Sequence, residues 1–407
     1  MNKNSNSIFN ITVLVAALGY FVDIYDLLLF QIVRVDSLKD MGLSMDQVKS
    51  EGEFIISVQM IGLLVGGIIW GVMGDKKGRL SVLFGSIVLY SIANIINGFV
   101  QTPFQYGLTR FFAGIGLAGE LGAGITLVSE LVSKEKRGLS TSFVAGIGLT
   151  GAVVAYFISQ NFHWRTCYFI GGGLGFCLLI LRISVLESGM FTKLKELDVQ
   201  RGNFFMFFTN GVRFKKYILA ILIGLPTWYV IGILVAFSND FGKAFGFSEE
   251  VLPKKSTMYA YTAIALADML VGFISHWLKS RKKVLFIFYG LTVLSFFLYF
   301  NQHNGTAADM YLICFAMGFS VGFWAIFVTM AAEQFGTNLR STATTTVPNM
   351  VRGALPLMFL LFKNLQLATG DYITAGWVTG AIVMTISFTA AWFTEETFGK
   401  DLNYVEN

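Results

Sequence analysis

Twelve long apolar runs constrain this chain more than any other feature of its sequence. A helix needs about 20 apolar residues to cross the hydrocarbon core of a bilayer. The chain is 55% hydrophobic and only 14% charged, whereas soluble domains carry about 25% charged residues. We therefore expect an all-α integral membrane protein with twelve transmembrane helices. The expected spans are 8–33, 54–73, 80–101, 105–131, 139–160, 165–186, 217–239, 257–278, 283–300, 308–332, 342–365 and 373–394.

Basic residues gather in the loops on one side of these spans. With the N-terminus inside, the inner loops hold many Lys and Arg residues, among them Lys76, Lys77 and Arg79, and the outer loops hold fewer. Because cytoplasmic loops are enriched in Lys and Arg, we expect a multi-pass protein with both termini in the cytoplasm. The short loops and termini are typical of the bacterial inner membrane. Basic helix ends also account for the net charge of +5 without a nucleic-acid partner.

The two halves of the chain repeat one charged pattern. Glu130 and Arg137 close the fourth span, and Glu333 and Arg340 close the tenth with the same spacing. An offset of 201 to 203 residues relates these segments and the ends of the second and eighth spans. Two homologous six-helix halves around a central site explain such a repeat. The predicted units are an N-terminal bundle at 1–186, a cytoplasmic linker with an amphipathic helix at 187–216, a C-terminal bundle at 217–394 and a cytoplasmic tail at 395–407.

Two acids interrupt the first span, in the stretch GYFVDIYDLLLF. Asp23 and Asp26 are three residues apart, so they share one face of a helix. Each costs about 2.5–3.5 kcal/mol at a bilayer centre. One interpretation is that they are proton acceptors on a wet central cavity, with either acid as the carrier. The alternative is a structural salt bridge or a polar contact between helices.

The fourth span carries Arg110 near its outer end and Glu120 nearer its middle, within GLAGELGAG. Glu120 is a candidate for a second proton site or for a substrate contact. The glycines around it favour close helix packing. No Lys-Ser/Thr pair follows them, so they do not form a phosphate-binding loop.

Arg352 lies deep in the eleventh span, within TTTVPNMVRGALP. Pro348 and Pro356 bracket it, so we expect a bent helix there. An unpaired Arg at this depth is costly. It therefore either pairs with an acid such as Asp268 of the eighth span or binds a substrate anion. Asp268 is interpreted equally well as an ion-pair partner and as a transport residue.

Several uncharged side chains are candidates for a pocket wall, although aromatic residues in such helices also serve as packing groups and interface anchors. The candidates are Trp228, Tyr229, Tyr261, Trp324, Asn349 and Gln59.

The sequence offers little material for catalysis. Three Cys and three His are scattered through the chain, without the spacing of a metal site or a disulfide framework. No nucleophile, metal cluster or nucleotide motif is apparent. We therefore expect no enzyme activity, metal or cofactor, and a monomer whose partners are the bilayer, a small-molecule substrate and protons.

Several motifs resemble the major facilitator superfamily over nearly the whole chain. GVMGDKKGRL resembles the loop motif between helices 2 and 3, with Leu80 replacing a basic residue. LTRFFAGIGLAGELGAG resembles the helix-4 motif, with Ala113 in place of its usual Gln. VLESGMFTKLKE and EETFGKDLNYVE resemble the segments after helices 6 and 12 of sugar porters and metabolite:proton symporters. DIYD resembles the helix-1 pattern of the latter group, with Ile24 replacing an aromatic residue.

This resemblance implies roles for several charged residues. It implies that Arg110 pairs with a helix-1 acid. It also implies an intracellular ion-pair network that holds the outward-open state, although ordinary surface charge is the alternative. The residues of that network would be Asp75, Arg79, Glu130, Arg137, Glu333 and Arg340.

Together these features predict a proton-coupled symporter that takes up a small polar metabolite by alternating access. Arg110 and Arg352 make an organic anion the first choice of substrate. A sugar or polyol symporter is the nearest alternative, favoured by the segments after helices 6 and 12. A proton-driven exporter and a non-transporting sensor with a carrier fold are the further alternatives.

Overall fold

A computed structural model describes residues 11–132, 136–182 and 199–406 of the chain. Within these residues all regular structure is helical, and twelve helical segments are long and apolar enough to cross a membrane. Both the all-α class and the twelve predicted spans are thereby confirmed. The protein is a multi-pass membrane protein.

The first six spans are single helices. Ser44 begins the second with a capping box completed by Gln47, and the Thr102 hydroxyl caps the fourth, whose first residue is Pro103. Both arrangements satisfy N–H groups that a helix start leaves free. The six helices are α1 (Ile11–Asp40), α2 (Met45–Lys77), α3 (Arg79–Asn97), α4 (Pro103–Leu131), α5 (Arg137–Asn161) and α6 (Trp164–Leu181).

Three of the six C-terminal spans are interrupted. The seventh passes from α9 (Gly211–Tyr229) through a π-helical turn, η3 (Val230–Val235), into α10 (Ser238–Ala244). The tenth is α13 (Ala307–Ser320) and α14 (Trp324–Gln334), and the eleventh is α15 (Arg340–Gly353) and α16 (Leu355–Thr369). The others are α11 (Pro253–Leu278), α12 (Arg281–Phe300) and α17 (Tyr372–Phe393).

The bend expected in the eleventh span is present at one of its two prolines. The helix breaks at Ala354, and Pro356 lies in the first turn of α16, where a missing N–H costs nothing. Pro348 lies inside α15 without ending it.

The seventh span begins earlier than the expected residue 217. The Asn210 side chain accepts hydrogen bonds from the N–H groups of Val212 and Arg213, so a capped helix starts at Gly211. The predicted linker at 187–216 therefore overlaps α9. Residues 183–198 lie outside the described part of the chain. The following segment contains the short helix α8 (Met206–Thr209).

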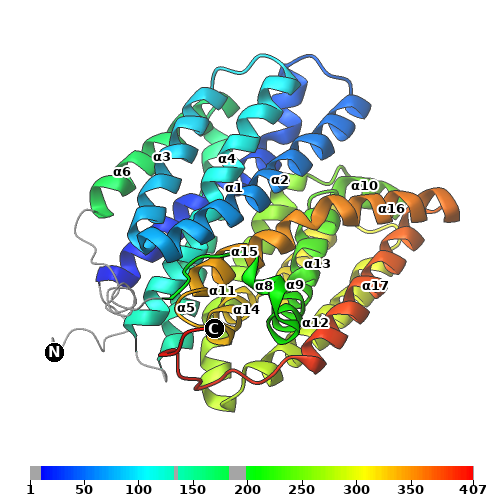
Figure 1. Ribbon diagram of the computed structural model, residues 1–407. Coiled ribbons are helices and arrows are strands. Elements are labelled where there is room, and N and C mark those ends of the chain that lie inside the picture. The colour runs from blue at the N-terminus through cyan, green and yellow to red at the C-terminus, as the bar shows by residue number, and fades with distance from the viewer. Residues whose placement is uncertain (1–10, 133–135, 183–198, 407) are drawn as a thin grey trace.

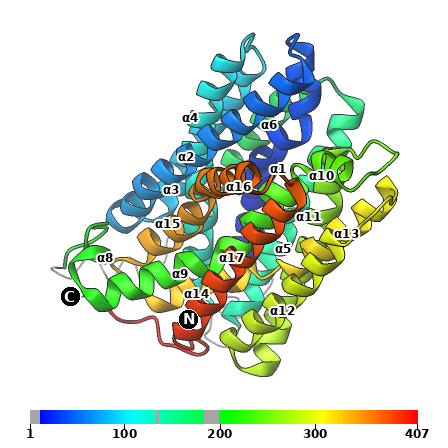
Figure 2. The same cartoon turned by 90° about the vertical axis from the view of Figure 1, so that its right-hand side faces the viewer.

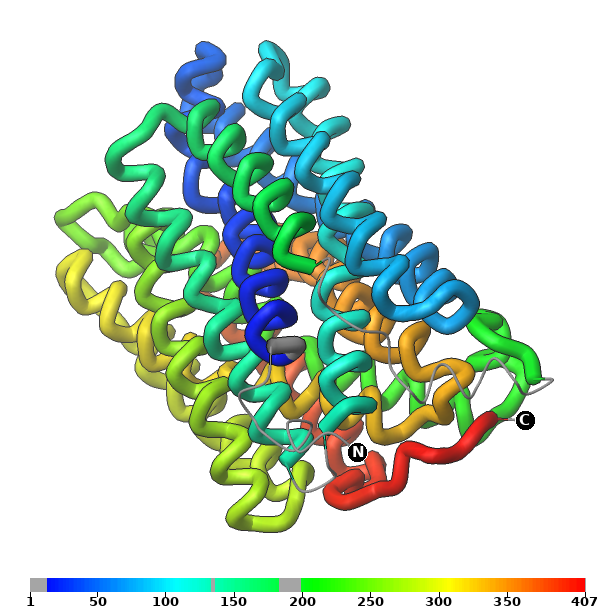
Figure 3. The backbone as a smooth tube through the Cα atoms, turned by 90° about the vertical axis from the view of Figure 1, so that its left-hand side faces the viewer, coloured from blue at the N-terminus to red at the C-terminus, as the bar shows by residue number. Residues whose placement is uncertain are grey.

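The two six-helix bundles lie side by side, with α1–α4 and α6 in the upper part of Figure 1, α5 at the lower left and most of the C-terminal helices at the lower right. They meet where α2 packs on α15 and α5 packs on α11. Within the C-terminal bundle, α17 lies beside α9 and α12 (Figure 2). The segment after α17, drawn in red, follows the lower edge of the molecule in Figure 3.

Glycines set the close approach of α2 and α4. A Cβ atom added at Gly66 would lie 2.3 Å from the carbonyl oxygen of Ile115, and one at Gly62 would lie 2.3 Å from that of Phe111. Neither backbone can move aside without displacing a helix. Small residues allow helix backbones to approach in this way in membranes.

We expect Gly66→Ala to lower the Tm of the purified protein, because overpacking costs about 1–3 kcal/mol. Gly173→Ala on α6 is the matched control, since an added Cβ there meets nothing within 4 Å. Thermal unfolding in detergent measures both variants. An unchanged Tm for Gly66→Ala would contradict the packing.

Candidate functional site

A small cavity lies between the two halves. Its volume is about 20 Å³, far below the roughly 300–1,000 Å³ that is typical of ligand sites, so a substrate larger than a water molecule enters only when the halves move apart. Most of its wall is aromatic or aliphatic, and Arg352 supplies a cation. The lining residues are Tyr20, Ile24, Leu149, Thr227, Trp228, Tyr261, Ile264, Trp324 and Arg352.

Arg352 is held between two indole rings. Its guanidinium carbon lies 5.8 Å from the ring centroid of Trp228 and 5.7 Å from that of Trp324. One nitrogen, Nη1, donates to Oδ1 of Asn349 at 3.0 Å, while Nε is buried with no hydrogen-bond partner among the described residues. No carboxylate in the described part of the chain forms an ion pair with Arg352. Its charge therefore faces the cavity without an ion-paired carboxylate among the described residues, and it is the cation that acts most strongly on Asp23.

Asp268 does not pair with Arg352, so the ion pair that the sequence offered as one alternative is not formed. Oδ1 of Asp268 accepts the N–H of Ala325 at 3.0 Å, at the start of α14. The break in the tenth span leaves N–H groups of this helix start without helical partners. Asp268 satisfies one of them and lies at the positive end of the helix dipole.

Asp26 and Arg110 form a buried ion pair. Arg110 donates from Nη1 and Nη2 to Oδ1 of Asp26, at 3.0 and 3.1 Å, and from Nη1 to Asn94 at 3.1 Å. The Tyr168 ring lies 5.3 Å from the guanidinium carbon. Both members of the pair are fully buried. Arg110 is not among the residues that line the cavity.

Asp23 is fully buried. Neither of its oxygens has a hydrogen-bond partner among the described residues. Its neighbours on α1, Tyr20 and Ile24, line the cavity. The charged groups that act on Asp23 are Arg352, Glu120, Asp26 and Arg182. Of the two acids in DIYD, Asp26 thus forms an ion pair with an arginine and Asp23 does not.

Glu120 pairs with Arg182, a residue that the sequence analysis missed. Nη1 of Arg182 donates to Oε2 of Glu120 at 3.0 Å, and Nη2 donates to Oε1. The pair packs against Gly19 of α1, where an added Cβ would collide with both side chains. A basic residue inside the sixth apolar run was the available signal.

The two amide candidates make backbone contacts. Gln59 donates to the carbonyl oxygen of Leu27 at 3.0 Å and is not among the residues that line the cavity. Asn349 donates to the carbonyl oxygen of Ala118 at 2.9 Å and orients Arg352 through its own oxygen. Trp228, Trp324 and Tyr261 do line the cavity, whereas Tyr229 donates to a backbone carbonyl of α17.

Two glutamates join the halves on the face where α2, α4, α11 and α14 end, here called the basic face. Glu130 accepts from Arg79 at 2.8 Å and from Arg340 at 3.0 Å. Glu333 accepts from Arg281 at 3.1 Å and from Arg137 at 3.5 Å. Each glutamate thus receives one arginine from its own half and one from the other. The residues that share the seven-residue spacing in the sequence therefore pair across the halves: Glu130 with Arg340, and Arg137 with Glu333.

Asp75 caps the start of α15. Its carboxylate accepts the N–H groups of Ser341 and Thr342 at 3.0 and 2.8 Å and the Thr342 hydroxyl at 2.7 Å. Nη1 of Arg79 lies 3.5 Å from Oδ1 of Asp75. A carboxylate from α2 therefore binds a helix start of the C-terminal half.

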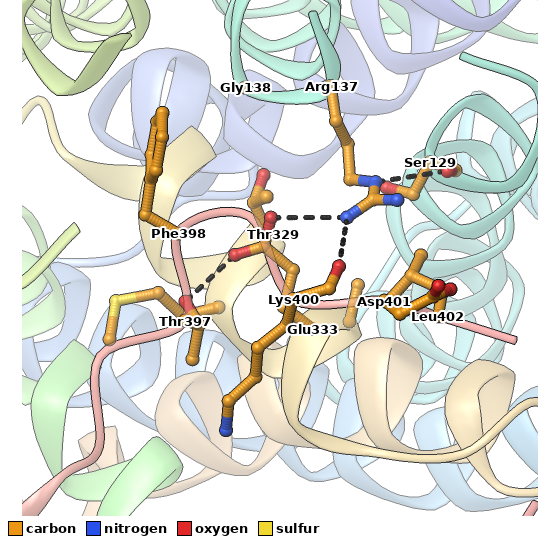
Figure 4. Close-up of polar contacts among 12 residues, drawn as sticks. Ser129, Arg137, Gly138, Thr329, Glu333, Thr397, Phe398, Lys400, Asp401 and Leu402 are labelled. Carbon is orange, nitrogen blue, oxygen red and sulfur yellow. Dashed lines mark hydrogen bonds and ion pairs between the residues drawn. The ribbon is translucent and has the colours of Figure 1, made fainter. Parts of the chain in front are cut away.

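The segment after α17 covers these contacts (Figure 4). The Thr397 hydroxyl donates to Glu333 at 2.8 Å, and Nη1 of Arg137 donates to the carbonyl oxygen of Lys400 at 3.4 Å. Burial opposes ionisation of Glu396, but hydrogen bonds from the Ser280 hydroxyl and the Arg281 N–H outweigh it and lower the pKa of Glu396. The tail is therefore tied to both halves.

The opposite face joins the halves through lysines. Nζ of Lys254 lies 3.0 Å from Asp36, and Nζ of Lys49 lies 3.8 Å from Asp240. Lys363 pairs with Glu53 in the same way. Since these pairs are partly exposed, each contributes about 0–1 kcal/mol. Removing one partner of a buried pair, as on the basic face, costs about 3–5 kcal/mol.

Twelve spans in two related bundles, with a small cavity between contacts at both ends, define a membrane transporter. The chain belongs to the Major Facilitator Superfamily, whose sequence profile matches residues 8–358.

Relatives and solved structures agree with this assignment. The putative niacin/nicotinamide transporter NiaP of Bacillus subtilis is 28% identical over 82% of each chain. The niacin transporter NiaP of Acinetobacter baylyi is 25% identical over 98% of this chain and 96% of its own. The proton:xylose symporter XylE, solved with 6-bromo-6-deoxy-D-glucose, has a TM-score of 0.78 at 17% identity, over 98% of both chains. The last likeness concerns the fold alone.

We expect Asp75→Asn to impair transport while substrate binding stays nearly intact, because Asp75 acts between the halves and far from the cavity. Lys76→Gln, an exposed neighbour, is the control. Uptake into liposomes and binding in detergent are measured on the same preparations. A loss of binding equal to the loss of transport would refute the assignment.

Proposed function

We propose that the protein is a proton-coupled symporter for a small carboxylate with a flat apolar body, such as an aromatic acid. One observation carries this proposal: the Arg352 guanidinium faces the cavity between two Trp rings, with no carboxylate partner in the described residues. Guanidinium and carboxylate groups form paired, charge-assisted hydrogen bonds. Indole rings offer flat faces to an aromatic ring. Niacin, which appears in the names of both relatives above, has this chemistry.

The proton is assigned to Asp23. An ionised carboxylate buried without a hydrogen bond is very costly. Asp23 has no hydrogen-bond partner in the described part of the chain that it must release when it takes up a proton. Asp26 would have to leave Arg110 first. A substrate anion at Arg352 would remove the cation that offsets a charge on Asp23, so substrate and proton would bind together. Asp26 and Arg110 then form the fixed wall behind this site.

The two sets of contacts between the halves support alternating access. We assign the basic face to the cytoplasm and the lysine pairs to the outside, in a bacterial inner membrane, with the transporter working as a monomer. The buried network of the basic face resists opening more than the exposed lysine pairs do. The resting protein would therefore open outward first, which suits uptake.

A sugar or polyol is the second candidate, suggested by segments shared with sugar porters. Sugar hydroxyls are usually bound by side-chain amides and other polar groups. Gln59 does not line the cavity, and Asn349 is engaged by Ala118 and Arg352. The lining favours an anion over a polyol.

We expect nicotinate and benzoate, but not xylose, to raise the Tm of the purified protein. Arg352→Gln should weaken nicotinate binding about 100-fold, which corresponds to about 2.7 kcal/mol, because the carboxylate loses its counter-ion. Lys283→Gln, an exposed residue of α12, serves as the charge control. Stabilisation by xylose alone, or unchanged binding in Arg352→Gln, would favour the sugar alternative.

We expect Asp23→Asn to change proton coupling and Asp26→Asn to change stability. Asp23→Asn should retain binding and substrate exchange across liposomes, but an inward proton gradient should no longer accelerate uptake. Asp26→Asn should lower the Tm, because a buried Arg110 without its partner costs about 3–5 kcal/mol. Gradient-driven uptake that persists in Asp23→Asn would move the proton to another acid.

A further inference from the structure

A buried arginine on α1 belongs neither to the cavity, nor to the basic face, nor to an ion pair among the described residues. Arg34 is on α1, toward the opposite face, and only 3% of it is exposed. Nη2 donates to the carbonyl oxygen of Ala236 at 3.1 Å, and the guanidinium carbon lies 4.4 Å from the ring centroid of Phe237. Both contacts cross from the N-terminal to the C-terminal half.

The contact lies where the two repeats face each other. Arg34 and Ala236 are 202 residues apart, within the offset of 201 to 203 residues that relates the halves. They therefore occupy equivalent positions, so their contact lies close to the pseudo-twofold axis. Any movement that opens this face between the halves must separate them.

Arg34 is incompletely satisfied while this face is closed. Nε and Nη1 are buried with no hydrogen-bond partner in the described residues. Asp240 and Glu53 are the acids that act on Arg34, and they pair with Lys49 and Lys363. A buried cation with unused donors is costly, so the closed state leaves Arg34 able to bind a further acceptor.

The segment that Arg34 holds also forms the cavity wall. Ala236 follows η3 directly, and α9, which leads into η3, contributes Thr227 and Trp228 to the lining. Arg34 and the site of Arg352 thus contact the two ends of one short helical segment.

We propose that Arg34 is the gate residue of the outer face and the first docking group for the substrate carboxylate, a role that rests on the proposed function. When this face opens, Arg34 leaves Ala236 and offers its planar set of N–H donors to the anion. When the face closes, the carboxylate passes to Arg352 and Arg34 returns to Ala236. The unused donors of Arg34 and the position of its contact on the axis support both steps.

The first test compares nicotinate uptake by Arg34→Met and Arg34→Lys. Arg34→Met should raise KM about tenfold or more, equivalent to about 1.4 kcal/mol, with a smaller change in kcat. Arg34→Lys should lie between it and the natural protein, because an ammonium lacks the planar fork. Lys243→Met removes an exposed charge from α10 and should leave KM unchanged. Equal KM values in all four proteins would overturn the docking role.

The second test needs no substrate. A cysteine at Thr227 is exposed to anionic and cationic methanethiosulfonate reagents from outside, with the parent containing Cys167, Cys177 and Cys314 as background. The anionic reagent should react faster than the cationic one. Arg34→Met should reduce this preference, whereas Arg34→Lys should retain it. A preference that survives in Arg34→Met would overturn the proposal. If nicotinate does not bind the natural protein, the proposed function fails, while this test still decides the role of Arg34.

Discussion

The crossed pairing of two glutamates with four arginines is the interaction on which the arrangement of the halves depends. Glu130 and Glu333 each bind an arginine from their own half and one from the other. If the arginines of one half did not reach the other half, each glutamate would be buried with one arginine instead of two. Because these side chains are almost fully buried, the two halves are energetically tied on the basic face. Asp75 and the C-terminal tail strengthen the same junction.

Inside the membrane, charges divide into those that are matched and those that are not. Asp26 with Arg110, and Glu120 with Arg182, form ion pairs within the N-terminal half. Asp23 and Arg352 have no such partners in the described residues. Arg352 lines the cavity, and Asp23 lies on α1 between Tyr20 and Ile24, which line it. Matched pairs make a rigid wall, whereas the unmatched acid and base are the groups that a proton and an anion can satisfy. The proposed coupling of the two follows from this division.

The two faces of the molecule are held by different chemistry. Buried arginines with planar, multiple hydrogen bonds close the basic face, and partly exposed lysines close the other. Exposed pairs are weak and screened by salt, so they separate more readily. The breaks in the seventh, tenth and eleventh spans occur in the C-terminal half, beside the cavity. Helix segments that end there can move without unfolding the long helices that support them.

The sequence by itself determined the twelve spans, the repeat and most of the charged residues that matter, because hydropathy and helical periodicity are local properties. It also indicated which arginines and acids lie so deep in the membrane that they need a structural or functional partner. Only the tertiary structure decided the partners. Asp26 rather than Asp23 binds Arg110, Asp268 caps a helix start instead of binding Arg352, and Arg182 neutralises Glu120. Such choices depend on how segments many residues apart pack against one another, and spacing along one helix carries no information about the side chain that faces it.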